Sequence, residues 1–472
     1  MYCSHLFVPL NSKTEIKQNM NYYSTNGKAP TADLKKAVVK GLAEDRGLYM
    51  PEEIYKLPQQ FFNDIHAMKF QDIAYNVASN FFGDDVDGDA LQDIVWDTLS
   101  FDCPVVKVED NIYALELFHG PTLAFKDVGA RFMARLLRYF TSSGNTGTAS
   151  TACQTVNVLV ATSGDTGSAV ANGFLGVEGI HVYVLYPKGK VSPIQECQFT
   201  TLGRNVTAIE VDGVFDDCQA LVKSAFMDEQ LNAHMRLTSA NSINVARFLP
   251  QSFYYFNAYA RIKQLLANSE NASPNLVMCV PSGNFGNICS ALFGHEMGLP
   301  IHRFIAANNA NDVFYQYLQT GQYEPRPSVQ TLANAMDVGD PSNFARILNL
   351  YSKNGQRSAE ETHQAITALI SGATYTDDQI RKAMQQCYKE TGYILDPHGA
   401  CGYQALKDGL KPGEVGIFCE TAHPAKFKEK VDEILGIDID IPARLRAFMD
   451  GQKQSVPMSK QFDDFKAYLM QQ

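Results

Sequence analysis

The sequence predicts an α/β protein with open, mostly parallel sheets flanked by helices, preceded by a small helical N-terminal domain. From Ile112 onward, short β-branched runs bounded by Gly, Pro, Ser or Asn alternate with helical stretches, which is the pattern of buried parallel strands. Such alternation places helices on both faces of a sheet. Between Asp33 and Phe101 the chain instead shows short helical stretches, among them LKKAVVKGLAEDRG and LQDIVWDTLS.

The predicted regions follow this change of pattern along the chain. The expected strands are the runs IYALELF, NVLVAT, HVYVLY, NLVMCV, HRFIAA and VGIFC. Residues 141–155, TSSGNTGTASTACQT, are small and polar, which predicts a flexible surface insertion. The expected divisions are a flexible extension over 1–19, an N-terminal domain over 20–108, a catalytic region of two α/β subdomains over 109–436 with a largely helical lobe around 321–388, and a surface-packed segment over 437–472.

Composition and charge exclude several classes of protein. With 472 residues, 45% hydrophobic and 19% charged, the chain has the composition of a multidomain globular enzyme. A net charge of −11 argues against a nucleic-acid partner, but local cations can still bind a small anion. Ten scattered cysteines without a CxxC pair indicate a reduced, cytoplasmic protein, and ten histidines without HxH or HExxH spacing predict no metal site. No secretory signal or membrane-length run is recognised, and we expect a monomer or a homodimer.

One lysine occupies an unusual position. In ALELFHGPTLAFKDVGARFMARLL, Lys126 lies where a predicted strand and turn meet the start of an amphipathic helix. A buried lysine there can form a Schiff base with a carbonyl cofactor. The structural alternative is a salt bridge with Asp127, or an aliphatic stem that reaches out to water.

Three further segments contain groups that bind anions. In an open α/β sheet, ligands bind where strands end and helices begin. The loop Ser282 to Asn287, SGNFGN, follows the strand NLVMCVP and is a candidate phosphate cradle, or else a plain strand-to-helix turn. The loop Ser163 to Ser168, SGDTGS, offers hydroxyls and backbone donors suited to a carboxylate, or else caps the next helix. SANSINVARFLPQ supplies Asn241, Ser242, Asn244 and Arg247 for a second phosphate, or else forms a capped turn with a surface arginine.

Together these features favour one cofactor. A lysine at a strand end, a glycine-rich phosphate loop, a hydroxyl-rich anion loop and a second phosphate site lie in one α/β chain. A lysine that forms a Schiff base with a phosphorylated cofactor indicates pyridoxal 5'-phosphate. No GxxxxGK[ST] or GxGxxG motif supports ATP or a nicotinamide cofactor instead.

With these motifs assembled, the sequence resembles the threonine synthase family, whose pyridoxal-phosphate enzymes have the fold called type II or tryptophan-synthase-β-like. The resemblance extends from about Tyr22 to Gly436 and rests on specific strings in the family's order. These are YYST, GLAEDRGLYMPE, FHGPTLAFKD, ATSGDTG, YPKGKVSPIQ, SANSIN, VPSGNFGN, NAMDVGDPSN and TAHPAKF. Where the family often has STRG and DGG, this chain has Asn26 and Arg46, so a substrate contact from the N-terminal domain is in doubt.

The resemblance implies a role for each candidate residue. Lys126 would form the Schiff base and then move protons. The cofactor phosphate would lie in the SGNFGN loop, the pyridine nitrogen of the cofactor would face Thr421, and Asp165 would lie near the ring hydroxyl of the cofactor. The remaining roles are those of Gly283, Asn284, Phe285, Gly286 and Asn287 for the cofactor phosphate, Ser163, Gly164, Thr166 and Gly167 for the substrate carboxylate, and Asn241, Ser242, Asn244 and Arg247 for the substrate phosphate.

The implied reaction is conversion of O-phospho-L-homoserine and water to L-threonine and phosphate, by γ-elimination followed by addition of water at the β carbon. That activity is one of a carbon–oxygen lyase acting on phosphate. Two alternatives stay open at this point. One is a related phospho-lyase that releases 2-oxobutyrate, and the other is a non-catalytic ligand-binding homologue. A dehydratase of the same fold would have no use for SANSIN and Arg247 as phosphate ligands.

Overall fold

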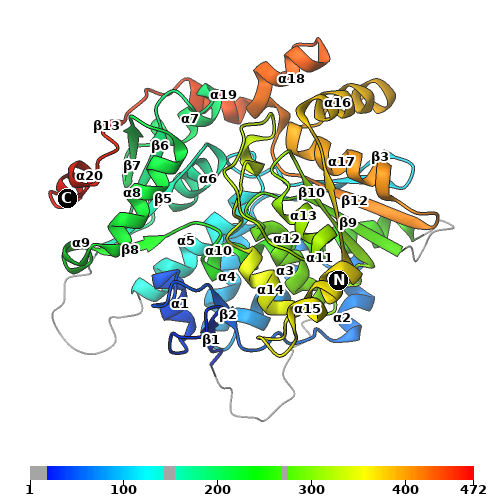
Figure 1. The fold of residues 1–472 in the computed structure, drawn as a ribbon, viewed down its shortest axis with the longest axis horizontal. Coiled ribbons are helices and arrows are strands. Elements are labelled where there is room, and N and C mark those ends of the chain that lie inside the picture. Colours follow the sequence, from blue (N-terminus) through cyan, green and yellow to red (C-terminus); the bar gives the residue numbers. More distant parts are fainter. Residues whose placement is uncertain (1–18, 143–154, 268–274) are drawn as a thin grey trace, which may run out of the picture.

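The structure is a computed structural model, which describes residues 19–142, 155–267 and 275–472. The predicted N-terminal extension up to residue 18 and most of the predicted polar insertion, 143–154, lie outside the described residues. Figure 1 shows two sheets side by side, with the N-terminal elements below them. The predicted α/β class with mostly parallel sheets is confirmed.

The N-terminal domain is mainly helical, as predicted, and adds a small antiparallel sheet of two strands. Within it, α3 buries Ile73, Val77 and Phe81 along one face and packs against α11 of the catalytic region. The elements are β1 (Tyr22–Ser24), α1 (Leu34–Lys40), β2 (Tyr49–Pro51), α2 (Gln59–Asp64), η1 (Ile65–Ala67), α3 (Phe70–Phe82) and α4 (Gly88–Thr98), with α11 at Ser252–Leu266.

The first catalytic sheet has six strands in the order β11-β10-β9-β12-β4-β3. All neighbours run parallel except β3 and β4, which form an antiparallel pair. Four of the expected strands are found here, and the central strands β9 and β12 are buried almost throughout. The bounds are β3 (Val105–Glu109), β4 (Ile112–Glu116), β9 (Asn275–Pro281), β10 (Arg303–Asn308), β11 (Ile370–Thr374) and β12 (Glu414–Glu420), with helices α12 (Gly286–Glu296), α13 (Val313–Thr320) and α17 (Pro397–Gly409).

The second catalytic sheet has five parallel strands in the order β13-β7-β6-β5-β8. It contains the other two expected strands, β5 and β6, at its centre. Helices α5 and α6 pack against each other, and α8 packs on β5 and β6. The bounds are β5 (Val156–Ala161), β6 (Ile180–Pro187), β7 (Val206–Val211), β8 (Arg236–Ser239) and β13 (Val456–Met458), with α5 (Lys126–Ser142), α6 (Asp165–Phe174), α7 (Pro193–Thr200), α8 (Phe215–Met227), α9 (Glu229–His234), α10 (Val245–Phe248) and η3 (Leu249–Gln251).

Two segments differ from the sequence-based expectation. The region 321–388 is largely helical but also contributes the edge strand β11. The segment 437–472 was expected to pack on the surface, but it is part of the fold. Its strand β13 pairs with β7, and the side chains of Phe465 and Leu469 are fully buried. The helices of these two segments are η4 (Asn334–Met336), α14 (Phe344–Tyr351), α15 (Ala359–Leu369), α16 (Asp377–Thr391), α19 (Ala443–Met449) and α20 (Phe462–Leu469). Between the two segments, η5 (Pro424–Phe427) and α18 (Lys428–Leu435) follow β12.

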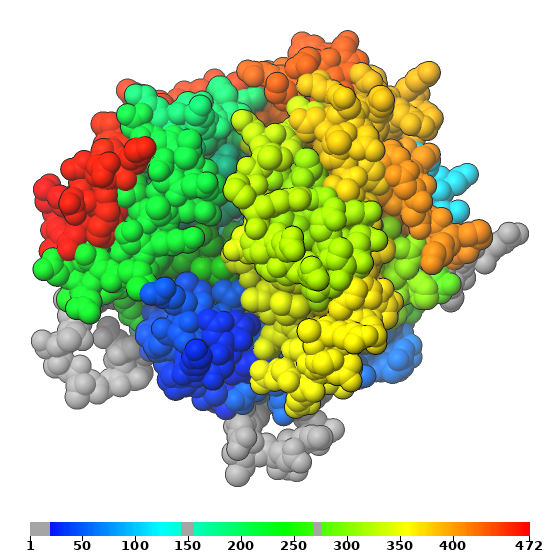
Figure 2. Space-filling view, in the orientation of Figure 1, coloured from blue at the N-terminus to red at the C-terminus, as the bar shows by residue number. Residues whose placement is uncertain are grey.

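The chain crosses between the two sheets directly after β4. Beyond that strand, the backbone N–H of Leu117 donates to the carbonyl of Glu420, the last residue of β12. The N–H of Phe125 donates to the carbonyl of Thr421, the next residue. The next residue, Lys126, begins α5, a helix of the other subdomain. Figure 2 shows the surface hollowed between the green five-stranded lobe and the yellow-green segment around residues 310–340. No helix in the described part of the chain is long and apolar enough to cross a membrane.

Candidate active site

The amine of Lys126 lies at the junction of the two subdomains. Its Nζ donates a hydrogen bond to Thr166 Oγ1 at 3.0 Å. Asp127 is not its partner, because that carboxylate accepts from the backbone N–H and hydroxyl of Thr122 at 2.8 and 2.6 Å. Burial lowers the pKa of Lys126 to about 8; Asp165 opposes this shift, and the cations Lys426 and Arg247 add to it. Part of its amine is therefore neutral near physiological pH.

The SGDTG loop presents backbone donors at the start of α6. Thr162 shapes the loop, since its hydroxyl accepts from the N–H groups of Gly164 and Gly167 at 2.9 and 2.8 Å. Neither Ser163 nor Asp165 caps α6, so the capping alternative does not apply to them; the side chain that bonds to the first turn is that of Thr162. Within the described residues, the N–H groups of Ser163, Asp165 and Thr166 make no hydrogen bond. A helix start with free N–H groups of this kind can bind a carboxylate.

Asp165 is the buried anion of the site. Its carboxylate forms an ion pair with Lys426 Nζ at 2.6 Å and accepts from Gln195 Nε2 at 2.9 Å. Burial alone would raise the pKa of Asp165, but Lys426, Lys126 and these hydrogen bonds hold the pKa well below its usual range. Asp165 is therefore ionised at any physiological pH.

The SGNFGN loop is shaped as a narrow cup before α12. A Cβ atom at Gly283 would lie 2.6 Å from the carbonyl oxygen of Ala335, and one at Gly286 would lie 2.8 Å from Ser242 Cβ. Phe285 is buried and has a left-handed φ of 59°, a backbone conformation that is uncommon for residues other than glycine. The N-cap residue Phe285 supplies no side-chain cap to α12. Asn287 Oδ1 accepts from the N–H of Ile288 at 2.9 Å, whereas the N–H groups of Gly286 and Asn287 make no hydrogen bond among the described residues.

Asn284 and Asn287 fix the walls of this cup. The amide of Asn284 donates to Ser242 Oγ at 2.9 Å, while its own Oδ1 accepts from the N–H of Ser342 at 2.7 Å. The amide of Asn287 donates to the carbonyl of Pro281 at 2.8 Å. The cup is thus held by neighbouring segments, and its backbone donors stay available.

The polar side chains of the SANSIN segment differ in whether the protein already supplies their hydrogen-bond partners. Asn244 is fully buried, caps α10 through the N–H of Ala246, and donates its amide to Val38 at 2.8 Å. Its side chain therefore caps and anchors the turn, which is the structural alternative that the sequence analysis gave for this segment. Ser242 lies against the cup, and Asn241 is half-buried.

Arg247 is a buried arginine, 2% exposed, so the surface alternative does not apply to it. Its Nε donates to the carbonyl of Ala240 at 2.7 Å, and a terminal nitrogen donates to the carbonyl of Lys126 at 3.1 Å. Burial lowers the pKa of Arg247 to about 10, which leaves it charged at neutral pH. These bonds use two of its five N–H groups, and the others can still bind an anion.

Thr421 follows β12 directly. Its carbonyl accepts from the N–H of Phe125 at 2.9 Å, which fixes it beside the residue before Lys126. Its hydroxyl, in a residue 6% exposed, makes no hydrogen bond within the described residues. A hydroxyl without a protein partner, in a largely buried residue, is the kind of group that a ligand satisfies.

Two buried cations next to this site were not recognised from the sequence. Lys426 lies in the quoted string TAHPAKF, and Arg346 lies just beyond NAMDVGDPSN. Arg346 makes five hydrogen bonds, to the carbonyls of Tyr49, Ser242 and Ile243 and to Asn343 Oδ1. Nothing in the local sequence separates either residue from an ordinary surface cation.

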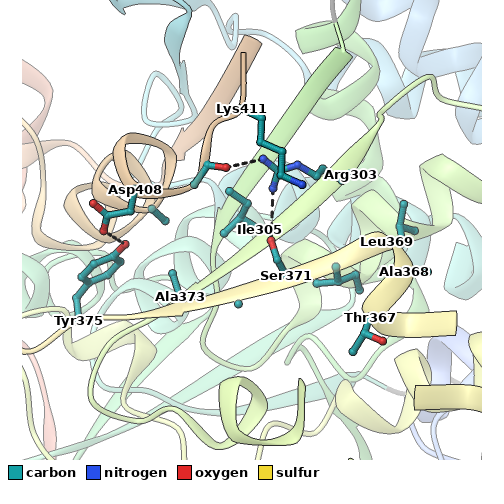
Figure 3. Close-up of a pocket in the computed structure, with 14 residues that line it drawn as sticks. Arg303, Ile305, Thr367, Ala368, Leu369, Ser371, Ala373, Tyr375, Asp408 and Lys411 are labelled. Carbon is teal, nitrogen blue, oxygen red and sulfur yellow. Dashed lines mark hydrogen bonds between the residues drawn. The ribbon is translucent and has the colours of Figure 1, made fainter. Parts of the chain in front are cut away.

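A separate cavity of about 420 Å³ lies along the edge strand β11. Figure 3 shows that Arg303, Ser371, Tyr375 and Asp408 line it. Arg303 is already paired with Glu414 at 2.6 Å, and the Tyr375 hydroxyl donates to Asp408 at 2.8 Å. None of the predicted site residues lines this cavity.

The described residues fit the cofactor that the sequence predicts. The free N–H groups of Gly286 and Asn287 behind a glycine cup suit its phosphate, the unpartnered Thr421 hydroxyl suits its ring nitrogen, and the Lys126 amine suits its aldehyde. No group of three or more His, Cys, Asp or Glu side chains in the described residues could hold a metal ion.

Comparison with known proteins finds three family descriptions along the chain. "Threonine synthase N terminus" matches residues 21–99, "Pyridoxal-phosphate dependent enzyme" matches 94–419, and "Threonine synthase, C-terminal" matches 399–469. The threonine synthase of Haemophilus influenzae is 42% identical over 454 residues, which is 96% of this chain and 100% of that protein.

Solved structures agree with this similarity. The crystal structure of threonine synthase from Escherichia coli has a TM-score of 0.85 and 39% identity, and the match covers 96% of this chain and 100% of that one. The structure of threonine synthase with bound pyridoxal phosphate from Brucella melitensis has a TM-score of 0.88 and 32% identity, covering 96% and 99% of the two chains.

Proposed function

The chain belongs to the threonine synthase family of pyridoxal-phosphate-dependent enzymes, and from that premise we propose which of its residues perform each part of the reaction. The enzyme makes L-threonine and phosphate from O-phospho-L-homoserine and water. When bound, pyridoxal phosphate withdraws electrons from the carbons next to the substrate amine, so that their protons can be removed.

Lys126 is the residue that would hold the cofactor and move the substrate protons. The observation that supports this most directly is its position: its Nζ contacts Thr166 of the SGDTG loop, and its carbonyl accepts from Arg247 of the SANSIN segment. The amine therefore lies between the two loops that would hold the two ends of the substrate. With its pKa lowered to about 8, the amine can both accept and release a proton near neutral pH.

The start of α6 would bind the substrate carboxylate. The free N–H groups of Ser163, Asp165 and Thr166 and the hydroxyls of this loop all lie at the positive end of the helix. Gly164 and Gly167 would serve mainly to shape the loop, because a Cβ at Gly167 would lie 2.4 Å from the side chain of Thr162.

Two phosphates would then bind on opposite sides of Ser242. The residues Gly283 to Asn287 would hold the cofactor phosphate at the start of α12. Asn241, Ser242 and Arg247 would hold the substrate phosphate, with the charge supplied by Arg247. Ser242 lies against the cofactor-phosphate cup, because a Cβ at Gly286 would lie 2.8 Å from Ser242 Cβ. Asn244 would act indirectly, by fixing the segment to Val38.

The ring of the cofactor would meet one neutral and one charged side chain. Thr421 would face the pyridine nitrogen with a neutral hydroxyl, which does not force a proton onto that nitrogen. Asp165 would lie near the ring hydroxyl as a carboxylate. We also propose that the enzyme works in the cytoplasm, which the free cysteines among the described residues support.

The test is the product mixture formed from O-phosphohomoserine by the purified protein with pyridoxal phosphate. Wild type should give threonine and phosphate in equal amounts, and Lys126→Ala should give neither. A matched control is Lys382→Ala, which removes an exposed lysine of α16 and should keep wild-type turnover. Phosphate accompanied by 2-oxobutyrate would move the function to the phospho-lyase alternative, and an active Lys126→Ala would refute the role of that lysine.

A further inference from the structure

A second lysine, Lys426, is buried next to the active site and has no part in the proposed reaction. It lies in η5, five residues after Thr421 along the chain, and its side chain is 0% exposed. Its Nζ binds Asp165 Oδ1 at 2.6 Å and the carbonyl oxygen of Thr122 at 2.9 Å. A buried ammonium needs such partners, because removal from water strongly disfavours its charged form.

Asp165 lies near two lysines, Lys126 and Lys426, but contacts only Lys426 directly. Lys426 forms the direct ion pair with this carboxylate. The amine of Lys126 instead donates to the neutral hydroxyl of Thr166 at 3.0 Å. The Asp165 carboxylate is therefore occupied by Lys426, and the Lys126 amine has a neutral hydroxyl as its nearest partner.

We propose that Lys426 is a positioning residue that occupies the Asp165 carboxylate and so leaves the Lys126 amine without a direct anionic partner. This inference rests on the proposed function, in which that amine holds the cofactor. Lys426 thereby also keeps Asp165 ionised and fixed in place beside the start of α6.

The other charged groups around Lys126 do not change this conclusion. Arg247, from α10, adds a second cation near the amine. Asp127, from α5, is engaged by Thr122, and burial raises its pKa. Burial and the neighbouring His119 lower the pKa of His423 to about 4, so this ring, which precedes η5, is neutral at physiological pH.

Removal of the Lys426 charge should raise the pKa of Lys126 for two reasons. Removal of the Lys426 charge takes away a cation that lowers the pKa of Lys126. It also frees Asp165 to pair with Lys126, and a carboxylate within about 4–6 Å raises a lysine pKa by about one to three units. Both routes raise the pKa of Lys126 above about 8.

The fold offers a reason why the variant should remain folded. Both acceptors of Lys426 keep another donor from α7, since Gln195 Nε2 bonds to Asp165 and Gln198 Nε2 bonds to the carbonyl of Thr122. Lys426→Met therefore leaves neither oxygen without a hydrogen bond.

The experiment measures how fast apoenzyme attaches added pyridoxal phosphate at Lys126, by visible absorbance, from about pH 6 to about pH 10. Only the neutral amine reacts with the aldehyde, so the midpoint of the rate reports the pKa of Lys126. Lys426→Met should move the midpoint up by about one unit or more. Gln195→Met, which removes a neutral donor from the same carboxylate, should move it much less, and Asp165→Asn should move it down.

Each outcome decides a separate point. A Lys426→Met midpoint equal to that of wild type would overturn the inference while leaving the proposed function intact. Failure of wild type to attach the cofactor at Lys126 would instead overturn the proposed function. If Lys426→Met does not fold, Lys426→Gln should shift the midpoint upward and Lys426→Arg, which keeps the charge, should not; equal midpoints for these two variants would overturn the inference.

Discussion

Replacement of Arg346 by methionine should weaken both the fold and the cofactor site. The guanidinium is fully buried between the N-terminal domain and the SANSIN segment, and it also lies 4.1 Å above the ring of Phe248. Within the described residues none of its hydrogen-bond partners is a carboxylate. All its hydrogen-bond acceptors are carbonyl oxygens of the backbone or of an amide side chain, and burial lowers the pKa of Arg346 to about 9.

The magnitude follows from the oxygens that would lose their donor. The carbonyls of Tyr49, Ser242 and Ile243 each accept from Arg346, and leaving a buried acceptor unsatisfied costs about 1–3 kcal/mol. Partial relaxation makes the sum less than additive, so we expect the free energy of unfolding to fall by about 3–5 kcal/mol. That is a large part of the stability of an ordinary domain.

The effect should also reach the cofactor phosphate. Arg346 holds Asn343, whose amide donates to the carbonyl of Asn284 at 3.0 Å and to Ser242 Oγ at 3.2 Å. Asn284 is a wall of the phosphate cup, and so Arg346→Met should weaken pyridoxal phosphate binding by about tenfold, or about 1.4 kcal/mol.

The assay combines urea unfolding of the apoprotein with an absorbance titration of pyridoxal phosphate at a temperature where the variant is folded. Arg303→Met is the matched control, because this arginine is also largely buried and hydrogen-bonded but lies at the remote cavity of Figure 3. It should lower stability without changing cofactor affinity. Equal cofactor affinity in wild type and Arg346→Met would refute the reasoning, even if stability fell.

Three further predictions can be checked with the same preparations. Gly286→Ala should weaken pyridoxal phosphate binding in the absorbance titration, because its Cβ would lie 2.8 Å from Ser242 Cβ, whereas Gly88→Ala, whose Cβ would lie 3.4 Å from its nearest neighbour, should bind normally. Phe465→Ala should lower the free energy of unfolding by about 3–5 kcal/mol, since the ring is fully buried in α20, and a change below about 1 kcal/mol would mean that the C-terminal helix packs only loosely. The apoprotein should gain stability as pH rises from about 8 towards 10.5, because the unfolded chain then binds a proton at Lys126 that the folded chain has lost; Lys126→Met should lack this part of the pH dependence, and an unchanged slope in urea titrations would contradict the lowered pKa.

Much of the fold could be predicted because its signals are local. All six expected strands are present, since buried parallel strands need continuous β-branched runs wherever they occur. The other seven strands in the described residues were not anticipated, and four of them, β3, β8, β11 and β13, lie at the edges of the two large sheets, where only one neighbour pairs with each. Edge strands need less apolar sequence, so their signal is weaker than that of a central strand. The C-terminal α20 was underestimated for a related reason, because its two buried side chains become core only when they meet α8.

The chemical groups available at this site can be identified from the amino-acid sequence. The lysine after a strand, the glycine loop and the hydroxyl-rich loop are short motifs whose backbone requirements are written in neighbouring residues. Which charged group lies next to each of them depends on the folded chain. Lys426 reaches Thr122 across 304 positions of the chain, and Arg346 reaches Tyr49 across 297. Protonation depends on burial and on the nearest charges, and both are set by segments that meet only after folding.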